Sequence, residues 1–111
     1  MKEIIYLASP YTSTDPQVME KRYEAVTEMA ARLIKEGKII FSPITMTHPL
    51  DKLLADGDTL GSDYWLDFDE AFMEACSELY VYKLAGWEES SGVIREISFF
   101  EKKGRKITYI E

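Results

Sequence analysis

The sequence predicts an α/β fold in which helices cover both faces of a mostly parallel sheet of four or five strands, a Rossmann-like or flavodoxin-like three-layer sandwich. Two observations predict this fold. Apolar, β-rich runs without polar alternation, such as residues 4–8, are typical of strands buried on both faces. These runs alternate with segments of helical periodicity, and strands joined by helices form right-handed βαβ units.

The first third of the chain predicts a strand, a helix and a second strand. Residues 4–8 form the first strand, which ends at Ser9-Pro10. Asp15 followed by Pro16 is typical of a helix start, with an N-cap and a proline in the first helical position. Gly37 is typical of a helix end, and residues 38–44 are predicted to form the second strand.

The periodicity weakens between residues 45 and 62, which we expect to form a long functional loop or lid. A short helix over residues 49–54 and a turn at Asp56-Gly57-Asp58 fit inside it. Ser62-Asp63 then opens a helix that precedes a third strand over residues 79–84.

The last third of the chain predicts a loop over residues 86–92, a helix that ends near Gly104, and a closing strand over residues 106–110. No internal repeat or linker divides the chain, so residues 1–111 are expected to form a single domain.

Composition narrows the classes of partner and compartment. The 20 acidic residues against 13 basic ones give a net charge of -7, which argues against binding to polymeric nucleic acid. One cysteine, Cys76, and the lack of a signal peptide or a long apolar segment predict a cytoplasmic protein without membrane contact. A domain this small is expected to gain stability as a homo-oligomer.

Ligands of open parallel sheets bind beyond the carboxyl ends of the strands, where three segments of this chain are expected to meet. They follow the first three strands at residues 9–12, 42–45 and 86–92, and all carry hydroxyl groups suited to a sugar or a phosphate. The candidate binding residues in the first two are Ser9, Pro10, Tyr11, Thr12 and Pro43.

The strongest local signal is the segment from Gly86 to Glu96. Ser90, Ser91 and Gly92 lead into a helix N-terminus, which favours an anion, and Glu96 follows one turn later on the same side. A ligand with its phosphate at the helix start would bring its sugar to Glu96. The alternative is an ordinary N-cap at Ser91 and a solvated Glu96.

Three other residues have both a functional and a structural interpretation. Asp69 belongs to an acidic cluster that either faces the site or is solvated surface. His48 has no nearby histidine or cysteine partner, so we expect no metal and no other cofactor, and a hydrogen-bonding role in a loop. Trp87 either stacks on a base or packs in the core.

Phosphate-binding Walker, dinucleotide-binding Gly-x-Gly-x-x-Gly and serine-hydrolase Gly-x-Ser-x-Gly motifs are all missing from the sequence. Kinase, dinucleotide-dependent dehydrogenase and serine-hydrolase functions therefore lose their main support.

The segments at residues 5–11 and 86–96, with Asp69 between them, resemble the nucleoside 2-deoxyribosyltransferase superfamily, which includes the 2′-deoxynucleoside 5′-phosphate N-hydrolases. Ser-Pro-Ile and His-Pro at residues 42–49 are similar to a short branch of bacterial and phage proteins. The resemblance spans nearly the whole chain, and its motifs occur in the order of that superfamily.

This resemblance implies roles for individual residues. Glu96 matches the carboxylate that attacks the anomeric carbon, Asp69 matches an aspartate that orients the sugar and supports proton transfer, and Tyr6 matches a tyrosine near the nucleophile. Ser90 stands where the nucleotide hydrolases carry a phosphate-binding serine, which favours a 5′-phosphorylated ligand, and Ser9 would line the same end. The resemblance also implies a pocket completed by a neighbouring subunit.

The sequence thus leads to three hypotheses. The first is an enzyme that cleaves or transfers the N-glycosidic bond of a nucleoside or nucleoside 5′-monophosphate. The second is a non-catalytic protein that senses or sequesters a nucleotide derivative on the same fold. The third is a small module whose acidic face contacts a protein partner.

Overall fold

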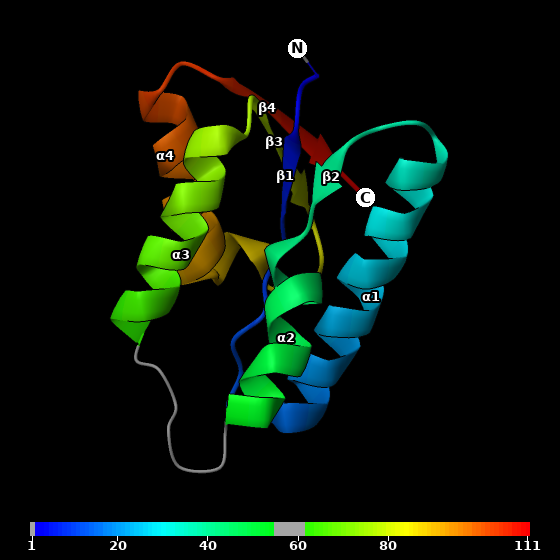
Figure 1. Ribbon diagram of the computed structural model, residues 1–111. Coiled ribbons are helices and arrows are strands. Elements are labelled where there is room, and N and C mark those ends of the chain that lie inside the picture. Colours follow the sequence, from blue (N-terminus) through cyan, green and yellow to red (C-terminus); the bar gives the residue numbers. More distant parts are fainter. Residues whose placement is uncertain (1, 55–61) are drawn as a thin grey trace.

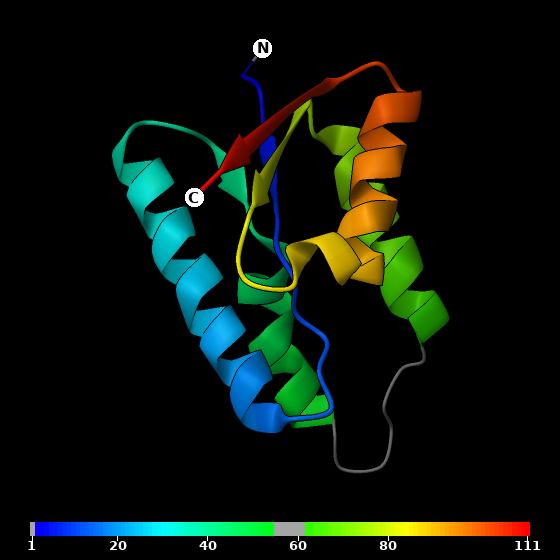
Figure 2. The same cartoon turned by 180° about the vertical axis from the view of Figure 1, so that it is seen from behind.

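The computed structural model describes residues 2–54 and 62–111. Within them, β1 (Ile5–Ala8), β2 (Ile40–Phe41), β3 (Glu78–Tyr82) and β4 (Lys106–Ile110) form a parallel sheet in the order β2-β1-β3-β4. Helices α1 (Pro16–Lys35) and α2 (Pro43–Leu54) lie on one side of this sheet, and α3 (Ser62–Ala75) and α4 (Ser91–Lys102) lie on the other (Figure 1; Figure 2). The predicted three-layer α/β fold is confirmed.

The central strand β1 is buried on both faces, which explains why its sequence does not alternate. Tyr6 and Ala8 pack in a core with residues of α3, β3 and α4, whereas Leu7 packs in a second core with residues of α1 and α2. Both Tyr6 and Leu7 are completely buried. A strand between two helical layers needs apolar side chains at every position.

Helix α1 begins and ends where its sequence predicts. The Asp15 carboxylate accepts a hydrogen bond from the backbone N–H of Gln17 at 2.9 Å, and Pro16 occupies the first helical position. The helix ends before Gly37, whose φ of 96° favours glycine.

Among the described helices, none combines the length and the low polarity needed to cross a membrane.

The prediction for residues 38–54 was partly wrong. The strand predicted over residues 38–44 spans only Ile40–Phe41. The short helix predicted over residues 49–54 is the second half of a longer helix, Pro43–Leu54, whose first half was expected to be strand end and loop. Ser42 and Pro43 start this helix: the Met46 N–H donates to the Ser42 carbonyl at 3.2 Å, and Pro43 suits the first turn. Pro49 inside the helix lacks an N–H and so masked the helical pattern. The predicted turn at residues 56–58 lies outside the described residues.

The strand order reverses between β1 and β3. From β1 the chain crosses to β2 on one side, and β3 then lies on the other side of β1 and leads to β4. The segments that follow β1 and β3 therefore diverge at the carboxyl edge of the sheet and leave a crevice, which is where ligands bind in folds of this type. The fold alone thus marks one place for a site.

Candidate active site

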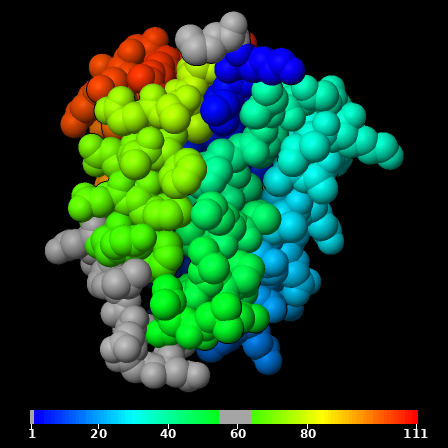
Figure 3. Space-filling model, viewed as in Figure 1, coloured from blue at the N-terminus to red at the C-terminus, as the bar shows by residue number. Residues whose placement is uncertain are grey.

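A cavity of about 640 Å³ occupies this crevice, a volume typical of small-molecule sites. Helices α2 and α3 lie side by side on the face of the molecule seen in Figure 3, and both contribute residues to the walls of the cavity. The segment after β1, α1, the segment after β3 and the start of α4 supply the rest. The described lining residues are Ser9, Tyr11, Thr12, Arg22, Pro43, Ile44, Thr47, Asp51, Trp65, Leu66, Asp69, Gly86, Glu89, Ser90, Ser91, Gly92 and Glu96.

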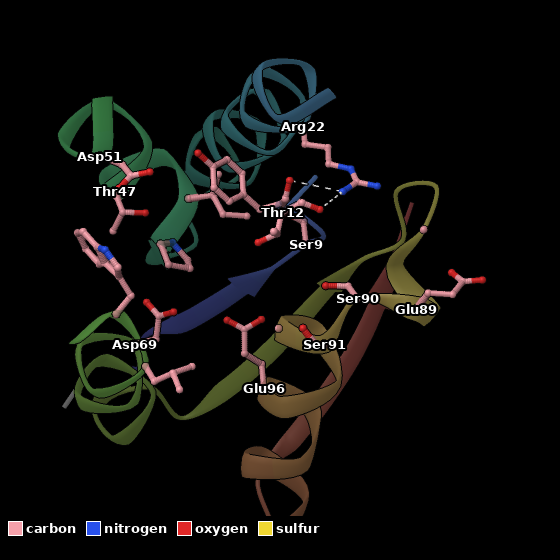
Figure 4. A pocket seen from close by; sticks show the side chains of 17 residues that line it. Ser9, Thr12, Arg22, Thr47, Asp51, Asp69, Glu89, Ser90, Ser91 and Glu96 are labelled. Carbon is pink, nitrogen blue, oxygen red and sulfur yellow. Dashed lines mark hydrogen bonds between the residues drawn. The ribbon is translucent and has the colours of Figure 1, made fainter. Parts of the chain in front are cut away.

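Glu96 lines this cavity between Asp69 and the start of α4 (Figure 4). Its residue is only 9% exposed, and its carboxylate accepts a hydrogen bond of 2.7 Å from the hydroxyl group of the fully buried Tyr6. Asp69 on α3 also lines the cavity, and Figure 4 shows its carboxyl group and that of Glu96 directed into the same space. The structure therefore brings Tyr6, Asp69 and Glu96 together and excludes the alternative of a solvated Glu96.

Burial changes the proton affinity of all three groups. It raises the pKa of Glu96 to about 8; the Tyr6 hydrogen bond opposes this shift, the charge of Asp69 adds to it, and Arg95 opposes it. The pKa of Asp69 rises to about 6, also through burial and against the influence of Arg95. The pKa of Tyr6 lies well above its usual value because the hydroxyl group is buried beside Glu96 and near Asp69. Two carboxyl groups with separated pKa values in one cavity are typical of a catalytic site.

The start of α4 lines the cavity at the end away from α2 and the start of α3. Ser90 caps the helix by accepting a hydrogen bond from the Val93 N–H at 3.3 Å, so the N-cap is Ser90 and the alternative of a cap at Ser91 was wrong by one residue. The amides of Ser91 and Gly92 belong to the first turn, which has no intrahelical acceptors. These groups and the helix dipole favour an anion.

Arg22 lies near this end, and the sequence analysis did not identify it. Its guanidinium group donates to the backbone carbonyls of Thr12 at 3.0 Å and of Tyr11 and Ala85 at 3.4 Å. These bonds tie the segment after β1, whose bonds to Arg22 are drawn in Figure 4, to the segment after β3. Within residues 2–54 and 62–111 Arg22 forms no ion pair, so its charge is available to a ligand.

Two details describe the surroundings of Arg22. Gly86 has a φ of 91°, which favours glycine, and a Cβ atom there would lie 2.9 Å from an Arg22 side-chain nitrogen and displace it. Ser9 is 5% exposed, and its hydroxyl group is the sole buried side-chain polar atom in the described part of the chain without a hydrogen-bond partner. A buried unpaired hydroxyl group in a cavity wall is suited to a ligand oxygen.

Three predicted binding residues do not line the cavity. Trp87 packs against Tyr109, with ring centroids 5.6 Å apart, and against the core, so its structural interpretation holds. Pro10 is fully buried. His48 belongs to α2 instead of a loop and bonds to Tyr11 and Glu20 beside the cavity. Ser9, Tyr11, Thr12, Pro43, Ser90, Ser91 and Gly92 line it as predicted.

The sequence analysis also missed the cavity wall formed by α2 and the start of α3. Thr47 and Asp51 are one helical turn apart on α2, and Trp65 and Leu66 face them from α3. Their helical spacing was the available signal for the first pair, but the loop prediction obscured it. No group of three or more histidine, cysteine or acidic side chains suited to a metal ion occurs among the residues that the structure describes.

Comparisons with other proteins place the chain in a family but not in a functional class. A search of curated proteins finds no match. A family model described as "Domain of unknown function (DUF1937)" matches residues 3–111, which is almost the entire sequence. The chain therefore belongs to the DUF1937 family.

Proposed function

We propose that this protein binds a nucleoside 5′-monophosphate and cleaves its N-glycosidic bond, or transfers the sugar to another base, with Glu96 as the nucleophile. One observation carries the proposal: the buried Glu96 carboxyl group, hydrogen-bonded by Tyr6 at 2.7 Å, shares with Asp69 a cavity large enough for a nucleotide. The resemblance of the sequence to nucleoside 2-deoxyribosyltransferases supports the same roles for these residues.

The distribution of charge along the cavity supports a phosphorylated ligand. The Arg22 guanidinium group, the start of α4 and the unpaired Ser9 hydroxyl group gather at one end, where a phosphate would be neutralised. Glu96 lies between that end and Asp51 on α2 (Figure 4). A nucleotide has its phosphate, sugar and base in the same order.

The wall opposite the phosphate end suits a base. Trp65, Leu66 and Ile44 provide apolar surface, and Thr47 and Asp51 provide hydrogen-bonding groups. Most binding pockets combine a largely apolar lining with a few polar groups that set orientation. A planar base with polar edges fits this combination.

The reaction follows from the position of Glu96 beneath the sugar. Breaking the C1′–N bond leaves positive charge on the sugar, which a carboxylate stabilises and then traps. An oxygen of Glu96 bonds to C1′, and the electron pair of the broken bond leaves with the base, which takes up a proton. Water then attacks C1′ and releases Glu96 and the sugar phosphate. A second base in place of water gives transfer.

Asp69 is suited to orient the sugar and to pass a proton during these steps. A positioned general acid contributes about 10² to 10⁴ in rate. The raised pKa of about 6 keeps part of the Asp69 population protonated near neutral pH, which a proton donor requires. The same proposal includes a homo-oligomer, in which a neighbouring subunit completes the open side of the pocket.

The test is incubation with a panel of nucleosides and nucleoside 5′-monophosphates, followed by mass spectrometry for free base and sugar phosphate. We expect base release from at least one monophosphate and none with Glu96→Gln. Glu101→Gln is the matched control, because Glu101 is an exposed glutamate on the same helix. Turnover that survives Glu96→Gln would remove Glu96 from the mechanism.

A second candidate function is non-catalytic binding of a nucleotide derivative. The raised pKa of Glu96, about 8, favours it, because a carboxyl group that is protonated at neutral pH donates a hydrogen bond instead of attacking carbon. Such a protein would bind its nucleotide stoichiometrically in calorimetry, and mass spectrometry would recover the ligand unchanged. The same incubation therefore separates the two functions.

A further inference from the structure

A hydrogen-bond chain lies behind the cavity wall, on the side away from Glu96. The Tyr11 hydroxyl group lies 2.6 Å from Nδ1 of His48, and Nε2 of His48 lies 2.6 Å from a carboxylate oxygen of Glu20. Lys52 holds the other oxygen of Glu20 at 3.2 Å. These hydrogen bonds connect the segment after β1 to α2 and α2 to α1. Tyr11 lines the candidate active site, whereas His48, Glu20 and Lys52 do not.

The direction of the hydrogen bonds follows from the charge of Glu20. Hydrogen bonds from Lys52 and His48 lower the pKa of Glu20, so this group is an ionised acceptor. Nε2 of His48 must then carry the proton that it donates to Glu20. In the uncharged ring Nδ1 is an acceptor, and the Tyr11 hydroxyl group is its donor.

The surroundings of His48 hold its ring in one orientation. His48 is 5% exposed, and the Tyr23 ring stacks on it with a centroid distance of 4.2 Å. Tyr11 meets the same ring edge-on at 5.6 Å. Tyr11 itself lines the candidate active site and also a second cavity of about 410 Å³ that includes Glu20 and His48. Among the described residues, Asp51 is the other one that lines both cavities, so Tyr11 and Asp51 lie where the two spaces adjoin.

We propose that His48 and Glu20 are positioning residues that orient Tyr11, whose ring forms a wall of the nucleotide pocket. The identity of the ligand in this inference rests on the proposed function. The hydrogen bonds orient Tyr11 and do not remove its proton. Burial and the charges of Asp51 and Glu20 raise the pKa of Tyr11, so its hydroxyl group stays protonated and donates to His48. A fixed ring spares the ligand the entropic cost of ordering it.

The first arm of the test is nitrogen-15 NMR of the imidazole ring in the free protein. His48 is the only histidine of the chain, so a single ring signal set reports on it. We expect the proton on Nε2, and we expect Tyr11→Phe to shift the Nδ1 resonance. A proton on Nδ1, or a spectrum unchanged in Tyr11→Phe, would overturn the inference without any ligand.

The second arm is calorimetric titration with dAMP, dCMP, dGMP and dTMP in the Glu96→Gln background, which prevents turnover. We expect Tyr11→Phe and Glu20→Gln each to weaken binding about three- to tenfold, the effect of one hydrogen bond. Their double variant should be no weaker than the worse single one, because both act through one chain. His48→Asn should bind better than His48→Leu, since the asparagine oxygen offers Tyr11 an acceptor in place of Nδ1.

Glu24→Gln is the control, an exposed glutamate one turn from Glu20 on the same helix, and should bind as the parent does. Equal affinities for the parent, Tyr11→Phe and Glu20→Gln would refute the positioning role while the proposed function stands. Failure of these four nucleotides and of AMP, CMP, GMP and UMP to bind would refute the proposed function, and the NMR arm would still decide whether the hydrogen bonds of His48 orient Tyr11.

Discussion

Glu96 has neighbours that act on its proton in opposite directions. Burial and the charge of Asp69 raise its pKa, whereas the hydrogen bond from Tyr6 and the charge of Arg95 lower it. The balance leaves the pKa at about 8, so Glu96 is mostly protonated at neutral pH and partly ionised there. If Glu96 is the nucleophile, base release must depend on pH through this group.

Tyr6→Phe and Asp69→Asn are expected to move this pH dependence in opposite directions. In the wild type, Glu96 should ionise with a midpoint near pH 8, and kcat/KM should be level between about pH 6 and 8, because the reaction needs Asp69 protonated and Glu96 ionised. Tyr6→Phe removes a hydrogen bond that favours the carboxylate and should raise the midpoint. Asp69→Asn removes a repelling charge and should lower it. Carbon-13 NMR of the Glu96 carboxyl group gives the same midpoints without turnover, and shifts of equal sign would contradict the electrostatic account.

Glu96→Gln is expected to stabilise the protein at alkaline pH. The pKa of Glu96 is about 8 in the folded protein, whereas the usual value of 4.5 applies to the unfolded chain. The folded protein therefore holds this proton more tightly. The wild-type free energy of unfolding therefore falls as pH rises from 4.5 to about 8, and this loss is absent from the variant. Urea unfolding should give equal stabilities near pH 4 and an advantage for Glu96→Gln of on the order of a few kcal/mol at pH 9. Glu101→Gln should show no such trend.

The start of α4 and the guanidinium group of α1 form the proposed phosphate site together. Arg22→Gln should weaken binding of a nucleoside monophosphate about tenfold or more, because a charge-assisted hydrogen bond is lost. Its affinity for the corresponding nucleoside should not change. Lys21→Gln, an exposed neighbour on α1, is the control. Equal losses for nucleoside and nucleotide would show that Arg22 supports the fold and not the phosphate.

Gly86 and Gly37 offer a matched pair at the level of the connecting segments. Both have positive φ values, 91° and 96°, so alanine at either position should cost about 1–2 kcal/mol in backbone strain. Only at Gly86 would the added Cβ atom meet Arg22, at 2.9 Å, whereas at Gly37 nothing lies within 4 Å. Urea unfolding should therefore show a loss in both variants, but nucleotide affinity should fall only in Gly86→Ala.

The candidate site connects the two halves of the whole molecule. Its residues come from helices on both sides of the sheet, and Tyr6 joins Glu96 to the central strand. A ligand there contacts elements from both cores and is expected to stabilise the global fold.

A bound nucleotide at about 100 times its Kd should add about 2.7 kcal/mol to the free energy of unfolding. For a domain of this size that corresponds to a rise in Tm of roughly 10 °C or more. Thermal unfolding monitored by circular dichroism measures the shift. Because any ligand of the native state raises Tm, the location is tested with Arg22→Gln, which should reduce the shift; an unchanged shift in that variant would place binding outside this cavity.

Much of the fold was predictable because it depends on local chemistry. Asp15-Pro16 and Gly37 lie within two residues of the two ends of α1, and the apolar run of β1 reports burial on both faces. The first half of the helix at Pro43–Leu54 was missed, because a proline such as Pro49 is unfavourable inside a helix and indicates a helix start there instead. Packing of Ile44 into the core beside α1 outweighs that preference.

By itself, the sequence determined the α/β class, the order of its elements and the helix start that carries Ser90 and Glu96, since caps, glycines and apolar periodicity act over a few residues. Only the tertiary structure decided that Arg22 joins the site, that Trp87 and His48 do not line it, and that Glu96 lies buried against Tyr6. The reason is physical: proton affinity and ligand access depend on groups 90 residues apart in the chain, which meet only when the sheet brings the segments after β1 and β3 to one edge.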